Sequence, residues 1–321
     1  MKSTTRIYVA GHTGLAGSAI LRRLNHERYE NLICYTHNEL DLIDQAATKA
    51  MFKLERPEIV VLAAAKVGGI AANDTFPSDF LYINLAIQNS VINAAVETGV
   101  QTLLFLGSSC IYPRNCLQPI KEEYLLSGPL EETNRAYAVA KIAGAELCWS
   151  ANKQHGCRYL AVMPANMYGP HDNYDSTHSH VIPGLIRRIH EAKLNGDKKV
   201  SIWGTGEPRR EFLYSDDLAD ACLFLLTNLD NLSSRLYSKD KPPLVNIGVG
   251  QDLTIHELSN IICGVVGFRG KLVFDTTKPD GTQRKLLDVS KMNGFGWKAK
   301  WSLTEGINNS YKDFLHRYGT Q

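Results

Sequence analysis

The sequence predicts an α/β fold built on a doubly wound parallel sheet. Strand-like and helix-like segments alternate over the first half of the chain. The expected strands are short and continuously apolar, as in Arg6–Ala10 and Ile59–Ala63, which indicates that helices cover both faces of the sheet. A glycine-rich turn joins the first strand to the first helix, a position where parallel sheets commonly bind ligands.

The first half of the chain supplies the sheet and the helices that cover it. Its apolar residues form either short uninterrupted runs, which favour buried strands, or longer stretches at helical spacing. Strands are expected at Arg6–Ala10, Leu32–Tyr35, Ile59–Ala63, Leu103–Leu106 and Tyr159–Val162, and helices at Leu15–Leu24, Asp44–Leu54, Pro77–Glu97 and Ala136–Lys153.

The second half is less regular and is expected to form a smaller lobe over the carboxyl edge of the sheet. It starts with a loop rich in His, Asp, Asn and Ser at His171–His180. We therefore predict one domain over residues 1–170 and a second over 171–321, with an approximate boundary and interleaved lobes. Helices are expected at Ile182–Ala192, Ser215–Leu226 and Ile255–Val266, and strands at Val200–Trp203, Leu244–Ile247 and Leu272–Phe274.

Composition excludes several classes of partner. The 321 residues carry a net charge of only +2 and no long basic run, so nucleic acid is not an expected partner. No apolar stretch is long enough for a membrane span, and no signal region precedes the first strand, so a cytoplasmic protein is expected. The seven cysteines form no C-x-x-C pair, so neither a disulfide framework nor a metal site is expected.

The turn after the first strand has the spacing G-x-x-G-x-x-G. Glycines let the backbone turn sharply and let a pyrophosphate approach the amides, while the following helix offers free N–H groups. A tight strand-to-helix turn also needs glycine, but the position of this motif after a strand and before a helix favours dinucleotide binding. The predicted contacts are Gly11, His12, Thr13, Gly14, Leu15, Ala16 and Gly17.

The end of the second strand should distinguish NAD(H) from NADP(H). An acidic residue there binds the ribose hydroxyls, whereas a basic residue accepts a 2′-phosphate. No acid follows the strand directly in Cys34–Asp41, which favours NADP(H), although no arginine is present either. His37 either contacts the phosphate or faces solvent.

Tyr137 and Lys141 are the candidate catalytic pair. Residues four apart lie on one face of a helix, and an ammonium beside a phenol lowers the pKa of the phenol. Such a tyrosine exchanges a proton with a carbonyl or alcohol oxygen near neutral pH. Y-x-x-x-K is common on surface helices, but here it follows a strand that ends at Ser108, whose hydroxyl could bind the same substrate oxygen.

Several longer strings resemble the extended short-chain dehydrogenase/reductase family, and within it the enzymes that epimerise and then reduce GDP-4-keto-6-deoxy-D-mannose. The resemblance covers nearly the whole chain and implies a Rossmann-type sheet with a smaller, interleaved C-terminal substrate-binding lobe. The strings are Ala63–Ile70, Leu106–Pro113, Ala136–Gly144, Tyr168–Asn173, Ser179–Pro183, Arg210–Leu213 and Lys278–Gly281.

The resemblance implies a role for each candidate catalytic residue. Tyr137 would protonate the C4 oxygen as hydride arrives from NADPH, Lys141 would lower its pKa and hold the nicotinamide ribose, and Ser108 would orient the ketone. Cys110 and His180 would be the acid/base pair that inverts C3 and C5 on the way to GDP-L-fucose. Taken alone, Cys110 would more often be a packing residue and His180 a loop residue.

The resemblance also implies contacts with the cofactor and with a nucleotide-sugar substrate, and a homodimer. Thr13, Tyr35 and His37 stand where members of the family can carry arginines. Further cofactor contacts are implied at Leu106, Gly107, Pro164, Ala165, Asn166, Met167 and His180, and substrate contacts at Arg188, Trp203, Arg210 and Asp280.

Two alternatives remain open at this point. A nucleotide-sugar 4-epimerase or another 4-ketoreductase could share the scaffold, but a 4-epimerase would not need Cys110 and His180 and would favour an acid at the end of the second strand. A non-catalytic NADP(H)-sensing regulator would tend to lack Tyr137 or Lys141, and both are present.

Overall fold

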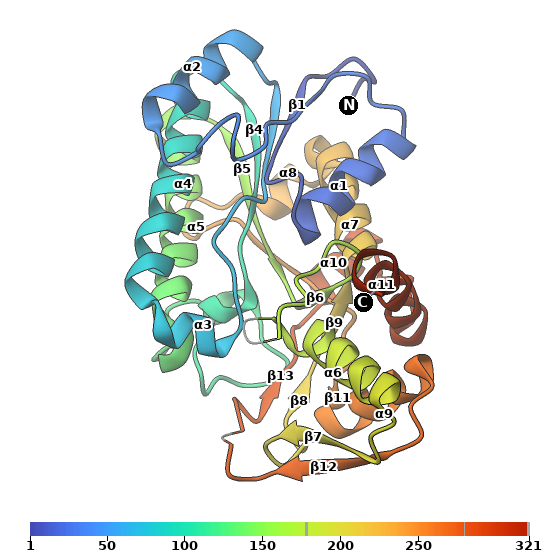
Figure 1. Cartoon of the computed structure of the whole chain (residues 1–321). Coiled ribbons are helices and arrows are strands. Elements are labelled where there is room, and N and C mark those ends of the chain that lie inside the picture. The colour runs from blue at the N-terminus through green and yellow to red at the C-terminus, as the bar shows by residue number, and fades with distance from the viewer. Residues whose placement is uncertain (177–178, 279, 320–321) are drawn as a thin grey trace.

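The computed structural model describes residues 1–176, 179–278 and 280–319. Its centre is a six-stranded parallel sheet in the order β10-β5-β4-β3-β1-β2, with helices on both faces (Figure 1). This architecture confirms the predicted doubly wound α/β fold. The strands are β1 (Ile7–Ala10), β2 (Leu32–Ile33), β3 (Ile59–Leu62), β4 (Thr102–Leu106), β5 (Arg158–Pro164) and β10 (Leu244–Ile247).

The order of the strands reverses at β1. Ile7 pairs with Leu32 of β2 on one side and with Ile59 of β3 on the other. The connections that leave β1 and β3 therefore diverge and open a crevice beyond their carboxyl ends, which is where open α/β sheets bind ligands.

Local sequence signals set the ends of the helices that cover the sheet. The Asp44 side chain caps α2 by accepting from the Ala47 N–H, Pro77 begins α4, and Gly156 ends α5 in the left-handed conformation. Helices α4 and α5 pack together on one face, and α1 packs with α7 on the other (Figure 1). The bounds are α1 (Leu15–His26), α2 (Gln45–Glu55), α3 (Ile70–Thr75), α4 (Pro77–Glu97), α5 (Arg135–His155) and α7 (Ser215–Thr227).

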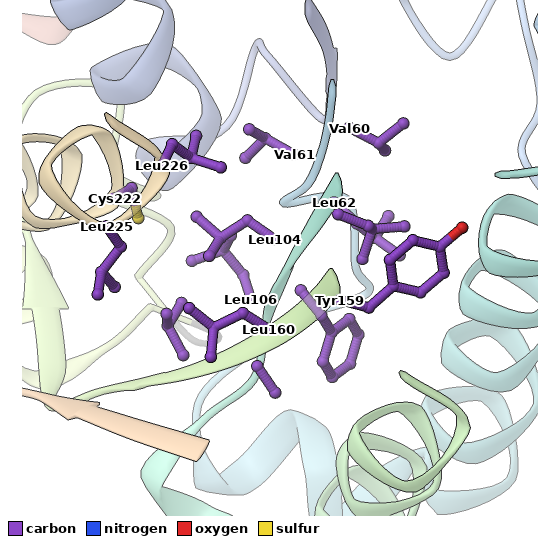
Figure 2. Close-up of a cluster of buried hydrophobic side chains, with 14 of the residues drawn as sticks. Val60, Val61, Leu62, Leu104, Leu106, Tyr159, Leu160, Cys222, Leu225 and Leu226 are labelled. Atoms are coloured by element: carbon purple, nitrogen blue, oxygen red, sulfur yellow. The ribbon is translucent and has the colours of Figure 1, made fainter. Parts of the chain in front are cut away.

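The main hydrophobic core lies between the sheet and its helices. Figure 2 shows Leu104 and Leu160 of the sheet beside Cys222 and Leu225 of α7, so a helix from the second half of the chain completes this core. Each fully buried aliphatic side chain contributes about 1.5–3 kcal/mol. The packing of this core therefore holds the carboxyl edge of the sheet in place, and the crevice lies at that edge.

A second core lies in the smaller lobe, which is at the bottom of Figure 1. The helices α6, α9 and α11 pack together there, beside the strand pair β7–β12 and the three-stranded sheet β11-β8-β13. Strand β6 pairs with β9 and leads from the main sheet into this lobe. The elements of this lobe are β6 (Asn166–Tyr168), α6 (Val181–Asn195), β7 (Lys199–Trp203), β8 (Arg209–Arg210), β9 (Phe212–Tyr214), β11 (Leu253–Thr254), α9 (Ile255–Val266), β12 (Lys271–Asp275), β13 (Arg284–Lys285) and α11 (Leu303–Tyr318). The helices α8 (Leu229–Leu236) and α10 (Ser290–Phe295) pack against the main core, and 3₁₀ turns occur at Ser109–Ile111, Glu122–Tyr124 and Glu132–Asn134.

Most expected elements are confirmed within a few residues, with two exceptions. Leu244–Ile247, expected in the small lobe, is β10 and pairs with β5 in the main sheet. The second strand ends at Ile33 rather than at Tyr35. The Tyr35 hydroxyl donates to Glu55, and the backbone turns at Thr36, whose N–H donates to Glu39. The division into residues 1–170 and 171–321 stays a prediction. Residue 279 of the string Lys278–Gly281 and residues 177 and 178 of the expected loop His171–His180 lie outside the described ranges.

Two findings bear on the expected environment. Within the described ranges, no helix is both long and apolar enough to cross a bilayer. All seven cysteines fall within these ranges and are free thiols.

Candidate active site

A cavity of about 840 Å³ opens at the carboxyl ends of β1 and β3. Its walls come from the glycine turn, the segments after β2 and β3, the end of β4, and the start of α6, so it occupies the crevice that the strand order creates. Many of the residues predicted from sequence line it together: Gly11, Thr13, Gly14, Leu15, Ala16, Gly17, His37, Gly107, Ser108, Tyr137, Pro164, Ala165, Asn166, Met167 and His180.

The glycine turn has no room for side chains at two positions. Gly11 has φ +82°, and a Cβ there would lie 2.6 Å from the backbone N of Ala64. A Cβ on Gly17 would lie 2.1 Å from the Gly11 oxygen. Helix α1 starts after Gly14 without a side-chain cap or an acidic residue in its first turn, so its free N–H groups are available to an anion in the cavity.

Helix α5 positions the Tyr137/Lys141 pair. Tyr137 lines the cavity and packs edge-on against Phe80 at 6.3 Å between ring centroids. Lys141 is buried, and its Nζ donates to the Leu106 carbonyl at 2.8 Å, at the end of β4. The Lys141 Nζ lies 5.7 Å from the centroid of the Tyr137 ring, which confirms that the two side chains share one face of the helix.

The pKa values of Tyr137 and Lys141 differ from the prediction that the lysine lowers the pKa of the tyrosine. Burial raises the pKa of Tyr137, with a smaller contribution from Cys110, so the expected lowering by Lys141 does not dominate. Burial also lowers the pKa of Lys141 to about 8. The physical reason is that a low-dielectric site disfavours both charged forms. Tyr137 is therefore a neutral phenol that can give up a proton to a substrate oxygen.

Ser108 and Cys110 lie in the turn that follows β4. The Cys110 N–H donates to the Ser108 Oγ at 3.3 Å, which holds the serine at the cavity wall. Cys110 itself is only 6% exposed and lies behind that wall. Burial raises the pKa of its thiol, and the nearby Lys285 ammonium opposes this most strongly. The thiol is thus held in its neutral form.

His180 lies at the start of α6, on the opposite side of the cavity from the β4 end. Its side chain is open to the cavity, yet the surrounding protein lowers its pKa by desolvation. A neutral imidazole can accept a proton and a neutral thiol can donate one, and the acid/base role of His180 and Cys110 stays a prediction.

The remaining candidates do not line this cavity. His12 faces a neighbouring cavity of about 320 Å³, and Leu106 is buried behind the wall, as Lys141 and Cys110 are. The four predicted substrate contacts belong to β7, β8, α6 and the segment before β13 in the small lobe: Arg188, Trp203, Arg210 and Asp280.

Trp203 is the most exposed residue of this second group, at 58%. The guanidinium of Arg188 lies 5.9 Å from its ring centroid and the Lys278 Nζ lies 5.6 Å away. Arg188 is held in place because it donates to the Ser201 carbonyl at 3.0 Å. An exposed indole between two cations can stack on a base or sugar while the cations meet phosphate oxygens.

Asp280 and Arg210 are tied into the protein. The Asp280 carboxylate accepts from the Thr205 N–H at 2.8 Å and from its hydroxyl at 2.7 Å. Burial lowers the pKa of Arg210, and the carboxylates of Asp280 and Glu131 partly offset this. A contact between Asp280 and a substrate hydroxyl or guanine stays a prediction, and the structure adds a positioning contact from Asp280 to the turn after Trp203.

Sequence reasoning assigned no role to several residues of the cavity wall. Ala64 and Lys66 line the cavity and belong to the string Ala63–Ile70, and Asp172 belongs to the string Tyr168–Asn173. Membership of these strings was the only feature of the sequence that pointed to these three residues. Asp172 is buried, its Oδ2 has no hydrogen-bond partner among the described residues, and burial raises its pKa to about 7. Among the residues described by the structure, no cluster of three or more His, Cys, Asp or Glu could hold a metal ion.

The sheet, the glycine turn and the Tyr137/Lys141 pair define a nicotinamide-dinucleotide enzyme of the extended short-chain dehydrogenase/reductase type. The chain matches the NAD dependent epimerase/dehydratase family over residues 7–248, and it belongs to that family.

Relatives within this family are more specific. GDP-L-fucose synthase 1 of Arabidopsis thaliana is 53% identical over 97% of this chain and 94% of its own length. Two structures from Campylobacter jejuni are each 39% identical over 98–99% of both chains. One is a GDP-6-OMe-4-keto-L-xylo-heptose reductase, with a TM-score of 0.92. The other is a GDP-D-glycero-L-gluco-heptose synthase in the presence of NADPH, with a TM-score of 0.91.

Proposed function

We propose that the protein converts GDP-4-keto-6-deoxy-D-mannose to GDP-L-fucose, by epimerisation at C3 and C5 followed by NADPH-dependent reduction of the C4 ketone. The observation that carries the proposal is the 53% identity with a GDP-L-fucose synthase over nearly all of both chains. The cavity supports it, because Ser108, Tyr137 and His180 face the same space beside the glycine turn.

The cavity fits a dinucleotide. Only glycine is tolerated at positions 11 and 17, and the N–H groups at the start of α1 face the cavity, as a pyrophosphate requires. The segment Pro164–Met167 and Gly107 line the adjoining wall, where we place the nicotinamide half, and Lys141 would hold its ribose. When bound, the reduced nicotinamide supplies the hydride. The related C. jejuni structure with NADPH supports NADPH as the form used.

We assign the reduction to Tyr137, Ser108 and Lys141. Ser108 and Tyr137 hydrogen-bond the C4 oxygen, so that the Tyr137 hydroxyl gives its proton to this oxygen as the C–H bond forms at C4. The ketone is reduced to an alcohol, and Tyr137 regains its proton from solvent. Lys141, whose pKa burial lowers to about 8, would stabilise the transient phenolate.

We assign the epimerisation to Cys110 and His180. The C4 ketone acidifies the protons on C3 and C5, and inversion requires removal from one face and return to the other. One of the two groups takes the proton while the other gives its own, so each inversion is redox-neutral. His180 lines the cavity at the start of α6, and Cys110 lies behind Ser108 in the turn after β4.

We place the GDP moiety in the small lobe. Arg188 and Arg210 would bind the pyrophosphate, Trp203 would stack on the nucleotide sugar, and Asp280 would accept from a hydroxyl or from guanine. On this assignment residues 1–170 hold the cofactor and residues 171–321 hold the nucleotide sugar. The cations around the exposed Trp203 ring support it.

We also propose a homodimer that works in the cytoplasm. Tyr82 of α4 and Val139 of α5 are 65% and 39% exposed, and because these two helices pack together we take both side chains as candidates for contact with a second copy. Free thiols at all seven cysteines fit a reducing compartment. Light scattering of the purified protein checks the dimer.

The proposed reaction is tested by NADPH oxidation with a panel of nucleotide 4-keto-sugars, with the product stereochemistry determined by NMR. We expect GDP-4-keto-6-deoxy-D-mannose to be the preferred substrate and GDP-L-fucose to be the product. A reduced product with unchanged C3 and C5 would indicate a simple 4-ketoreductase instead. NADPH binding without consumption of any of these sugars would favour a regulatory protein.

A further inference from the structure

The adenosine end of the cavity is formed by the segment that follows β2. In this fold the ribose of the adenosine half lies at that position, about 20 residues after the glycine turn. The cavity wall there contains Tyr35, His37 and Leu40–Ile43. This segment therefore decides whether a ribose hydroxyl or a 2′-phosphate is preferred.

The charges in this wall are mostly negative. Asp41 lines the cavity, and its Oδ1 accepts from the Ile43 N–H at 3.0 Å. Glu39, two residues earlier, accepts from the N–H and hydroxyl of Thr36 at 2.7 and 2.8 Å, and these bonds lower its pKa. Both carboxylates are thus fixed in the segment after β2, and Asp41 is the one that lines the cavity.

A third carboxylate, that of Glu55, lies next to Tyr35. Its hydroxyl donates to the Glu55 Oε1 at 2.6 Å, and this bond, with smaller effects of burial and of charge, raises the pKa of Tyr35. The phenol therefore remains neutral, and its donor is already used by Glu55. The Tyr35 side chain therefore cannot bind a 2′-phosphate in the way that a cationic side chain at this position would.

No strong cation opposes these acids at this end. Among the residues that the structure describes, Lys66 is the only lysine or arginine in the wall of the cavity. It follows β3 rather than β2, and its Nζ is paired with Asp79 at 2.9 Å. His37 is the only basic side chain after β2 in this wall, and it lies 3.8 Å from Asp41 with 79% of its side chain exposed.

We propose that this chain takes NADH as well as NADPH, and that Tyr35 and Asp41 are the residues that remove the preference for the 2′-phosphate. Asp41 can accept from the 2′-hydroxyl of NADH through Oδ2, which meets no protein donor among the described residues. A 2′-phosphate at this wall would meet the Asp41 carboxylate, and His37 is the only basic side chain of the segment after β2 that lines the wall. The inference rests on the proposed dinucleotide site, but not on the identity of the sugar.

The test is a fluorescence titration of the full-length protein with NADPH and with NADH, without sugar. A charge-assisted bond from an arginine to a phosphate stabilises by about 1.5–3 kcal/mol, which corresponds to roughly tenfold to a hundredfold in Kd. Without such a bond, we expect NADPH to bind less than about tenfold more tightly than NADH. A preference for NADPH of tenfold or more overturns the inference.

Two substitutions and one control sharpen the test. Tyr35→Arg should shift the ratio of the two Kd values towards NADPH by about tenfold or more, and Asp41→Asn should shift it in the same direction by less. Leu194→Arg adds the same charge as Tyr35→Arg on an exposed position of α6 and should leave the ratio unchanged. If Tyr35→Arg and Asp41→Asn shift the ratio no more than Leu194→Arg does, the inference is wrong.

The outcome separates this inference from the proposed reaction. If both nucleotides bind but no 4-keto-sugar is turned over, the proposed reaction fails and the cofactor inference stands. If the sugar is turned over but NADPH alone binds, the reverse holds. Binding of neither nucleotide would contradict both.

Discussion

The glycine turn and the Trp203 cluster are the two ends of the proposed site, and they are built differently. The Trp203 cluster consists of Arg188, Trp203 and Lys278. The turn is built of backbone, and added side-chain atoms at Gly11 or Gly17 would collide with other backbone atoms. The Trp203 cluster is built of side chains that reach into solvent, with Trp203 58% exposed. A rigid backbone cradle suits a constant group such as a pyrophosphate, whereas exposed side chains can be exchanged to suit different sugars.

The relatives agree with this contrast. Proteins at 39% identity share the fold over nearly the whole chain, yet their names refer to GDP-heptoses rather than to GDP-fucose. Substitutions in the two regions should therefore have different effects, on cofactor binding in the first and on substrate recognition in the second. The predictions below run from the largest expected effect to the smallest.

Tyr137→Phe tests the chemistry at the junction of the two regions. Loss of the only hydroxyl assigned as proton donor should lower kcat for reduction by roughly 10²–10⁴-fold, the usual contribution of general acid catalysis. Exchange of the C3 and C5 protons with solvent should continue, because it depends on Cys110 and His180. Stopped-flow NADPH oxidation and NMR measure the two steps. Equal loss of both would show that Tyr137 is not specific to reduction.

Cys110→Ser should impair the epimerisation, whereas Tyr137→Phe should impair the reduction. Removing the thiol should slow inversion at C3 and C5 by about 10²-fold or more, because the proton of a serine hydroxyl is much harder to remove than that of a thiol. NADPH should bind as it does to the wild type, since Cys110 does not line the cavity. Normal incorporation of solvent deuterium at C3 and C5 by the variant would contradict the assignment.

Gly17→Ala tests the backbone end. The added methyl group would lie 2.1 Å from the Gly11 oxygen, so the turn must move away from its present course. We expect the Kd for NADPH to rise by about tenfold to a hundredfold because the pyrophosphate loses bonds to several amides. Gly264→Ala is a comparison in α9 of the small lobe, where nothing lies within 4 Å of the added Cβ and the backbone is helical. An unchanged Kd for Gly17→Ala would show that the turn does not hold the cofactor.

Trp203→Ala tests the side-chain end. Removal of the indole should raise KM for the nucleotide sugar by about tenfold, which is the size of a stacking and cation–π contribution of 1–2 kcal/mol. The Kd for NADPH should not change, and Trp203→Phe should restore part of the loss. If Trp203→Ala weakened NADPH binding instead, the assignment of the two ends would be wrong.

Asp172→Asn should have the smallest effect, and only on stability. Burial raises the pKa of Asp172 from 3.8 to about 7, and Arg317 and Asp313 are its charged neighbours. Because the folded state prefers the protonated form, this stabilising contribution is complete below about pH 4 and is lost as the pH rises towards 7. The variant should therefore gain Tm relative to the wild type as the pH rises from about 4 to about 7. A constant difference in Tm would contradict this.

The sequence could predict what depends on local patterns. The buried strands and long amphipathic helices were found because apolar spacing follows from the backbone period, as for Pro77–Glu97, whose bounds are those predicted. The pairing partner of Leu244–Ile247 could not be predicted, because an apolar strand fits either lobe and pairing joins residues far apart in the chain. Two-residue strands such as β8 and β13 carry no periodic signal at all.

The same limit applies to the site. The residues that line the cavity could be predicted from motifs, but their electrostatics could not. Tyr137 and Lys141 are close as expected, yet the cost of burial on both charged forms reverses the expected lowering of the Tyr137 pKa. The partner of Asp280 is Thr205, which lies 75 residues earlier. Such contacts depend on the assembled fold rather than on local sequence.

The central claim is that one site inverts two carbons and then reduces a third. It is tested most directly by running the reaction of GDP-4-keto-6-deoxy-D-mannose with unlabelled NADPH in deuterium oxide and reading the product by NMR. The account predicts GDP-L-fucose with deuterium at C3 and C5 and with protium at C4, delivered by the cofactor. A product with protium at C3 and C5 would contradict the account, because it would show that the ketone is reduced without inversion.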